Sequence, residues 1–302
     1  MHNRKPTRSA AGRWIVHLWR EWTTEIWRPI SPASAKPGPS KWSDARVTLA
    51  WIGHSTVLIN FFGVIILTDP VLFPRIGIRL PGFTIGPKRL TAPALSFDEL
   101  PKIDLVLLSH AHFDHLDLRT LQRFNASTKI ITARATSDLL KGTQFSDVTE
   151  LEWGQSRSVS NAAGEIEITA FPVNHWGARM QRDMYRGYNG YLIQRKERRI
   201  IFAGDTAMTE NFAALRRHGP IDVAIMSISA YNPWIQSHCT PEQAVQMANA
   251  AGARFIMPVH HQTFRLSFEP FCEPIQRFEA ALSKTPERIA LHEIGQTFVL
   301  PM

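Results

Sequence analysis

A cluster of ionisable side chains follows an apolar run about a third of the way along the chain. Residues 107–118 read LLSHAHFDHLDL, and the ionisable members are His110, His112, Asp114, His115 and Asp117. Imidazoles bind borderline metals, and carboxylates complete such sites. A buried strand has no use for these groups at its end, because unpaired polar groups are costly to desolvate. The cluster therefore indicates a metal site; a solvated His-rich loop is the alternative, which the apolar lead-in disfavours.

The spacing within the cluster predicts two neighbouring ions. Residues two apart in an extended segment point to the same side, so His110 and His112 could chelate one ion. Asp114 and His115 come where the chain is expected to turn into a helix from Leu116, and they could face a second ion.

Further candidate ligands follow three later strands. They are His175 in ITAFPVNHWG, Asp205 in RIIFAGDT, and His260 with its neighbour His261 in RFIMPVHHQTF. Each could have a structural role by itself, such as helix capping by Asp205. Gly204 permits a close backbone approach beside Asp205. Placements of this kind after several strands favour one shared site.

These motifs resemble a known family. SHAHFDHLD, NHWG, AGDT and PVHHQTF, in this order, are similar to the metallo-β-lactamase superfamily over about residues 46–300. WIGHSTVLI, LTDPV, GPKRL and AYNPWIQSHCTPEQAV resemble, more closely, the N-acylphosphatidylethanolamine-hydrolysing phospholipase D group. The resemblance implies an α/β fold, the four-layer αββα sandwich, with a dinuclear site at one edge of its two sheets.

The resemblance also implies a ligand set and a cofactor of two divalent ions, expected to be zinc. His110, His112 and His175 would bind the first ion, and Asp114, His115 and His260 the second. Asp205 would bridge the two ions. His260 is preferred to the adjacent His261 because it directly follows Pro258-Val259, as the family's ligand follows its strand.

Two ions about 3.5–4 Å apart can share a hydroxide, since metal coordination lowers the pKa of water to around 7. Asp114 could orient this hydroxide, and His238 could donate a hydrogen bond or a proton to the substrate. His54 is expected to be a buried supporting histidine, and Asp69 and Asp117 to brace loops. The predicted protein is thus a binuclear metal-dependent hydrolase of a phosphodiester, phospholipase D-like. The hydrolase alternative is a lactonase or other ester hydrolase.

The composition of the chain favours some classes of substrate and binding partner over others. Among 302 residues, 34 basic and 26 acidic ones give 34 − 26 = +8, which favours an anionic small molecule or a lipid as substrate. A nuclease is disfavoured because no basic-aromatic binding module is evident, so nucleic acid is not expected as a partner. A membrane-associated or regulatory binding protein with a vestigial metal site is the alternative from another class. Two cysteines exclude a disulfide framework and a four-thiolate zinc site.

The chain is predicted to have two sections. Residues 1–45 form an amphipathic helix, with Trp14, Leu18 and Trp22 at helical spacing, followed by a Pro/Ser-rich linker; residues 46–302 form the hydrolase domain. Residues 13–30 could make peripheral membrane contact, although few cations accompany the helix. No apolar run is long enough to span a membrane, so a cytoplasmic location, peripheral at the membrane at most, is expected.

Apolar runs and turn signals predict the elements of the domain. Strands are expected at 47–52, 56–60, 64–67, 105–108, 129–132, 166–170, 188–194, 200–203, 223–227, 255–258 and 298–300. Helices are expected at 116–124, 135–141, 209–217, 241–250 and 270–282. Residues 73–89, rich in glycine, proline and cations, are expected to form a long surface loop.

Overall fold

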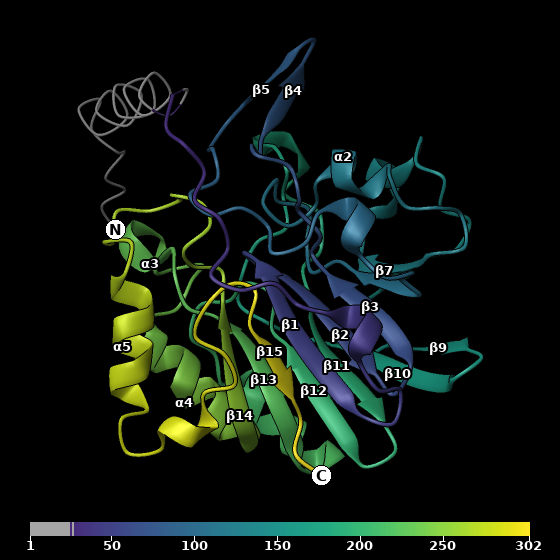
Figure 1. Ribbon diagram of the computed structural model, residues 1–302, viewed down its shortest axis with the longest axis vertical. Helices are drawn as coiled ribbons and strands as arrows, with labels where there is room; N and C mark the ends of the chain where they lie inside the picture. Colours follow the sequence, from purple (N-terminus) through teal and green to yellow (C-terminus); the bar gives the residue numbers. More distant parts are fainter. Residues whose placement is uncertain (1–24, 26) are drawn as a thin grey trace, which may run out of the picture.

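Two facing β-sheets form the centre of the protein in the computed structural model, which describes residue 25 and residues 27–302 (Figure 1). In order across the seven-stranded sheet, the strands are β15 (Thr297–Val299), β1 (Val47–Gly53), β2 (Thr56–Phe61), β3 (Val64–Thr68), β6 (Leu105–Leu107), β7 (Lys129–Ala133) and β8 (Val148–Leu151). In the six-stranded sheet they are β14 (Ala253–Val259), β13 (Ile221–Ser227), β12 (Arg198–Phe202), β11 (Gly190–Arg195), β10 (Gly164–Phe171) and β9 (Ser156–Asn161).

Short helices complete the described elements. The α-helices are α2 (Leu118–Leu121), α3 (Tyr231–Trp234), α4 (Pro241–Ala251) and α5 (Glu273–Ala281). The 3-10 helices are η1 (Pro39–Lys41), η2 (Phe97–Glu99), η3 (Ser137–Leu140), η4 (Gln181–Asp183), η5 (Glu210–His218) and η6 (Pro286–Arg288). Within the described residues, no helix combines the length and the apolar content needed to cross a bilayer.

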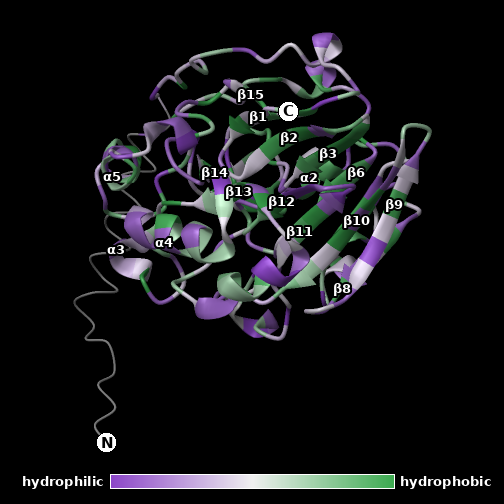
Figure 2. Ribbon diagram, turned by 90° about the horizontal axis from the view of Figure 1, so that it is seen from below, coloured by the Kyte–Doolittle hydropathy of each residue, from purple (hydrophilic) through white to green (hydrophobic). Residues whose placement is uncertain are grey.

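The central strands, such as β1, β2 and β13, are buried on both faces because each sheet is covered on both sides. Leu49 and Trp51 of β1 pack into the core between the sheets, whereas Ala50 and Ile52 of the same strand pack into a separate outer core. This alternation follows from the two-residue period of a strand. Figure 2 shows the largely hydrophobic central strands and the hydrophilic edge strand β9. The predicted four-layer αββα sandwich is confirmed.

Helix α4 shows how sequence signals position an outer layer. Thr240 caps its N-terminus by accepting a hydrogen bond from the amide of Gln243, Pro241 begins the helix, and Gly252 ends it in a left-handed conformation. A threonine N-cap followed by proline at the first helical position is a typical sequence signal for the start of a helix. The apolar side of α4, including Met247, packs on the outer face of the six-stranded sheet.

Three element predictions need correction. Residues 73–89 contain a β-hairpin, β4 (Ile78–Leu80) and β5 (Phe83–Ile85), because Pro81-Gly82 makes a turn between two short apolar segments. The helices expected at 135–141 and 209–217 are the 3-10 helices η3 and η5. Strands β8 and β9 were missed because they are sheet edges; β9 is mostly exposed and polar and lacks an apolar run.

The predicted N-terminal helix lies almost wholly outside the described residues. The linker that follows runs along the domain: Ser31 forms a β-bridge with Thr91, and the amide of Ala35 donates to the carbonyl of Ile294 (3.3 Å). Lys36 forms an ion pair with Glu99. The linker therefore follows the domain surface through main-chain as well as side-chain contacts.

Candidate metal centre

The predicted site residues come from the ends of strands in both sheets. The segment after β6 supplies His110 to His115, the segment after β10 supplies His175, and Asp205 and His260 follow β12 and β14. Strands β3, β6 and β7 pair in parallel, as do β12, β13 and β14. Within each sheet, the carboxyl ends of these strands therefore lie on the same side. The structure brings all the predicted ligands together there.

One cluster consists of three imidazoles. His110 Nε2 lies 2.8 Å from His112 Nδ1, which lies 3.3 Å from His175 Nε2. Burial lowers the pKa of His110 and His175 and holds that of His112 at about 3, so these rings are neutral at pH 7. Neutral imidazole nitrogens that converge in a buried site are the ligand form that a divalent ion requires. These residues therefore fit the first ion of the resemblance.

The second cluster combines carboxylates and imidazoles. His115 Nε2 lies 3.5 Å from Asp114 Oδ2 and 3.1 Å from Asp205 Oδ2. His260 Nε2 lies 3.3 Å and 3.2 Å from the same two oxygens. Asp205 Oδ2 is also 4.0 Å from His175 Nε2 of the first cluster. Asp205 thus stands between the clusters, where a bridging carboxylate would have to be.

The charges of the second cluster are strongly coupled. Burial by itself would raise the pKa of Asp114 and Asp205, but neighbouring imidazoles hold both pKa values well below the usual range. Burial by itself would lower the pKa of His260, but Asp205 and Asp114 raise it to about 9. The pKa of His115 is likewise held well above its usual value. Protonated histidines neutralise these buried carboxylates. A bound cation could take over that role, and the histidines would then lose their protons.

This coupling predicts that metal binding releases protons. His260, with a pKa of about 9, and His115 are protonated at neutral pH without metal, yet a histidine must be neutral to bind an ion. Zinc affinity should therefore rise with pH up to about 9. Calorimetric titration of the apoprotein in buffers of different ionisation enthalpy measures the proton count. Heats independent of the buffer would contradict this charge assignment.

Buried partners orient the candidate ligands. Asp69 Oδ2 lies 2.6 Å from His115 Nδ1 and accepts a hydrogen bond from the Ser109 hydroxyl at 2.5 Å. That hydroxyl also lies 2.8 Å from His110 Nδ1, and the carbonyl of Ser237 lies 2.7 Å from His175 Nδ1. Such contacts fix the imidazole tautomer and direct the other nitrogen toward the site. Asp69, expected to brace a loop, in fact supports a candidate ligand.

Replacing Asp69 with asparagine is expected to weaken zinc affinity about 10–100-fold, as is typical for a partner of a metal ligand. One side-chain oxygen of Asp69 faces His115 and the Ser109 hydroxyl, and the other accepts from the Ser109 amide (2.7 Å). The NH₂ group of asparagine cannot accept at either position. Competition with a chromophoric chelator measures the affinity. A wild-type affinity in this variant would show that Asp69 does not orient His115.

His54 is a buried histidine that contacts a candidate ligand, in keeping with the supporting role expected for it. Its Nε2 lies 3.0 Å from Asp114 Oδ2, and its carbonyl accepts a hydrogen bond from the amide of His260 (3.1 Å). Its left-handed backbone (φ 53°) directs the carbonyl and the ring to these two neighbours. The WIGHSTVLI motif was the signal for it. Asp117, at the N-cap position of α2, pairs with Arg119 (3.0 Å) and accepts a hydrogen bond from the Thr120 hydroxyl (2.8 Å), in keeping with the expected bracing role.

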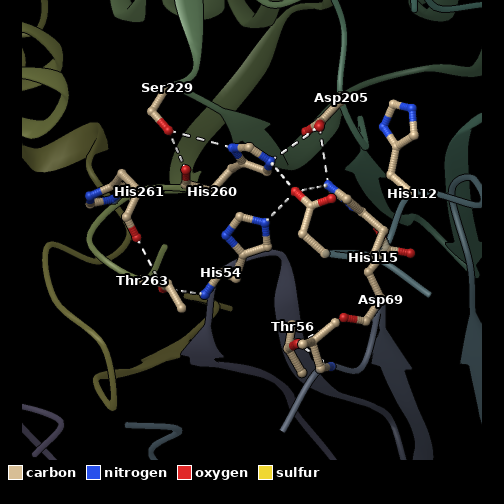
Figure 3. Close-up of polar contacts among 12 residues, drawn as sticks. His54, Thr56, Asp69, His112, His115, Asp205, Ser229, His260, His261 and Thr263 are labelled. Carbon is tan, nitrogen blue, oxygen red and sulfur yellow. Dashed lines mark hydrogen bonds and ion pairs between the residues drawn. The ribbon is translucent and has the colours of Figure 1, made fainter. Parts of the chain in front are cut away.

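The adjacent histidines of PVHHQTF have different environments. His260 adopts a left-handed backbone conformation (φ 67°), so the two side chains diverge. The His261 ring packs on Trp51, with 4.5 Å between ring centroids, and neither of its nitrogens has a partner among the described residues. Figure 3 shows His54, His115 and His260 turned toward one centre and His261 turned away. The geometry places His260, rather than His261, with the predicted ligands.

A cavity of about 360 Å³ opens beside the two clusters. His112, Asp114, Asp205 and His238 are among the residues that line it, and His238 Nδ1 lies 3.8 Å from Asp205 Oδ2. Burial lowers the pKa of His238 to about 3. His238 is therefore a neutral group in the cavity lining, where it could form a hydrogen bond with a bound molecule.

Arg179 also lines this cavity, and sequence reasoning missed it. Its Nη1 donates to the carbonyls of Ala111 (3.0 Å) and Leu116 (2.8 Å), and its guanidinium lies 4.0 Å above the Phe113 ring. Arg179 thereby holds both ends of the loop that carries His112 to His115. It lies just beyond NHWG, but a single arginine gives no sequence signal of such a contact.

Comparison with known proteins shows the family of the chain. The family description "Beta-lactamase superfamily domain" matches residues 65–261. N-acyl-phosphatidylethanolamine-hydrolyzing phospholipase D 1 of Caenorhabditis elegans is 32% identical over 249 residues, which cover 77% of this chain and 68% of that protein. An uncharacterized protein of Mycobacterium tuberculosis is 32% identical over 279 residues, covering 89% of this chain and 73% of the relative.

The fold has solved counterparts as well. The crystal structure of a possible metal-dependent hydrolase from Veillonella parvula superposes with a TM-score of 0.66 at 19% identity, covering 85% of this chain and 100% of that one. At this identity the likeness concerns the fold alone.

Proposed function

Because the chain belongs to the β-lactamase superfamily of metal-dependent hydrolases, we propose that it is a binuclear zinc phosphodiesterase with phospholipase D-like activity. The position of Asp205 Oδ2 carries this proposal. It contacts His115 and His260 at 3.1 and 3.2 Å and lies 4.0 Å from His175 of the other cluster. A buried carboxylate near the imidazoles of both clusters supports a site for two ions.

The proposed ligands are His110, His112, His175, Asp114, His115, His260 and Asp205. Two divalent ions held there would supply an activated water at neutral pH, because coordination lowers the pKa of water to around 7. Asp114 lines the cavity beside these ligands, where its carboxylate could orient that water. His238 can donate a hydrogen bond to the substrate from the wall. Because burial lowers the pKa of the imidazoles in the first cluster, these rings are unprotonated at neutral pH and their nitrogens can bind an ion.

An anionic phosphodiester, such as a phospholipid, is the proposed substrate. The net charge of +8 and Arg179 on the cavity wall favour an anion. Trp176 and Trp234, 39% and 45% exposed, line the same cavity and offer apolar surface to a lipid chain. The name of the nematode relative gives a lipid phosphodiester as its substrate. A cytoplasmic location with peripheral membrane contact, including contact through residues 13–30, belongs to the same proposal.

A substrate panel on metal-analysed protein tests the proposal. We expect about two zinc ions per chain and hydrolysis of bis(p-nitrophenyl) phosphate and of an N-acylated phosphatidylethanolamine, both lost after chelation and restored by zinc. Preferential hydrolysis of lactones or carboxylic esters would instead assign the lactonase alternative. Absence of bound transition metal together with absence of hydrolysis would favour a binding protein with a vestigial site.

A further inference from the structure

The hairpin β4–β5 presents apolar side chains to solvent. Ile78 pairs with Ile85, and Leu80 pairs with Phe83. These four side chains are between 36% and 52% exposed, and none belongs to a hydrophobic cluster of the described residues. Figure 1 shows the hairpin projecting from the body of the protein. An isolated hairpin of this size is marginally stable in water, so a specific cause must hold it in this position.

The base of the hairpin is firmly anchored. Ile76 is buried against Val71 and Phe264. Gly77 and Gly86 face each other so closely that a Cβ at either position would meet a main-chain carbonyl oxygen at 2.1 Å. Arg119 donates from Nη1 to the Thr84 hydroxyl at 2.9 Å. The protein therefore holds this hairpin outward through a buried base, close backbone contact and a side-chain hydrogen bond.

Unpaired cations accompany the apolar tip. Arg79 lies on β4 between Ile78 and Leu80. Arg79 and Arg182 both line a cavity of about 580 Å³ beside the hairpin. Among the residues that the structure describes, neither arginine has an ion-pair partner, whereas nearby Arg186 pairs with Asp138 and Asp183. Long cationic side chains beside an apolar tip are typical of segments that enter the headgroup region of an anionic bilayer.

The base of the hairpin also lines the cavity at the candidate metal centre. Ile76, Gly77 and Pro87 at its base line the same cavity as Asp114 and Asp205. Exposed Trp176 and Trp234 line the cavity as well, and tryptophan is favoured at membrane–water interfaces. A surface in contact with the hairpin tip would therefore lie close to the opening of the site.

From this arrangement we propose that the hairpin 78–85 inserts its apolar tip into the surface of an anionic membrane. Ile78, Leu80, Phe83 and Ile85 enter the interface, and Arg79 and Arg182 contact lipid phosphates. This contact brings the metal-centre cavity to the lipid. Arg79 and Arg182, which have no ion-pair partner among the described residues, favour an anionic lipid surface over a second copy of this chain, which is itself basic, with a net charge of +8. That the bound lipid is also the substrate rests on the proposed function, but the binding does not.

Co-sedimentation of the full chain with phosphatidylcholine vesicles, with and without phosphatidylglycerol, tests the proposal. The double variant Leu80→Ser/Phe83→Ser should bind the anionic vesicles on the order of 10²-fold more weakly, because two large apolar side chains no longer enter the interface. Val299→Ser is the matched control: Val299 is 46% exposed on β15 and should leave binding unchanged. Arg79→Ala should weaken binding only to vesicles that contain phosphatidylglycerol.

Two further measurements distinguish membrane insertion from damage to the metal centre and from self-association. Hydrolysis of soluble bis(p-nitrophenyl) phosphate should be unchanged in the double variant, which shows that the hairpin change leaves the site intact. If the protein hydrolyses no substrate, vesicle binding still tests membrane insertion. Failure of the proposed hydrolase activity is therefore distinguishable from failure of the insertion proposal. Undiminished vesicle binding by the double variant would overturn it. The proposal would also be overturned if the wild type sedimented as a dimer and the double variant as a monomer that still bound vesicles. A second copy of the chain would then be the partner that covers the hairpin.

Discussion

Replacing Asp205 with asparagine is expected to lower hydrolysis on the order of 10³-fold, beyond the roughly 10–100-fold effect of losing a partner that only orients a ligand. Asp205 Oδ2 contacts His115 and His260 and approaches His175, so the change removes a negative charge that both clusters share. Metal content should fall together with kcat. Elemental analysis after exhaustive dialysis and steady-state hydrolysis of bis(p-nitrophenyl) phosphate measure the two quantities.

Asp222 provides a matched control for this variant. It is a buried aspartate on β13, where it pairs with Arg198 at 2.6 Å and accepts the amide of Arg199 at 2.8 Å. Asp222→Asn should destabilise the fold by about 1–3 kcal/mol, through a weakened charged hydrogen bond, and leave metal content unchanged. An Asp205→Asn protein that kept full metal content and activity would remove the observation on which the proposed function rests.

Activity should fall strongly when His260 is replaced with asparagine, but only slightly when the neighbouring His261 is replaced with the same residue. His260→Asn is expected to lower activity on the order of 10²–10³-fold, because it removes an imidazole that contacts both Asp114 and Asp205 and leaves these buried carboxylates partly uncompensated. His261→Asn should keep at least about half of the activity and metal content, since its ring packs on Trp51 away from the clusters.

Thermal unfolding distinguishes the reasons for these two outcomes. His261→Asn should cost about 1–3 kcal/mol of unfolding free energy from lost packing in the buried core. His260→Asn should abolish most of the stabilisation that added zinc gives to the wild type, because a ligand stabilises only the state that binds it. Equal losses of activity in both variants would mean that the segment after β14 acts as a unit, and that the geometry does not select His260.

The sequence predicted the chemistry of the site well, for a physical reason. Metal ligands must be specific residue types, and loops at the carboxyl ends of neighbouring parallel strands meet at one edge. The motifs around His110, His175, Asp205 and His260 therefore carried enough information to predict one site. Buried strands such as β1 and β13 were predictable because strands covered on both faces read as continuous apolar runs.

Polar edge strands and short helices were not predictable in the same way. β9 has one buried residue, and nothing in SRSVSN distinguishes an edge strand from a loop. The glycines and prolines of the stretch 73–89 predict a loop, yet close contact between Gly77 and Gly86 closes its base into a hairpin. Contacts of this kind join positions whose pairing no local pattern specifies.

The sequence by itself thus determined the fold class, the candidate ligands and the family, because each depends on residue type and order along the chain. Only the tertiary structure decided which neighbours those residues meet. It turned His260 into the site and His261 onto Trp51 through one left-handed residue, set Asp69 behind His115 and His54 against Asp114, and raised an apolar hairpin beside the cavity. Such outcomes depend on distances between segments far apart in the chain, which spacing within a motif cannot encode.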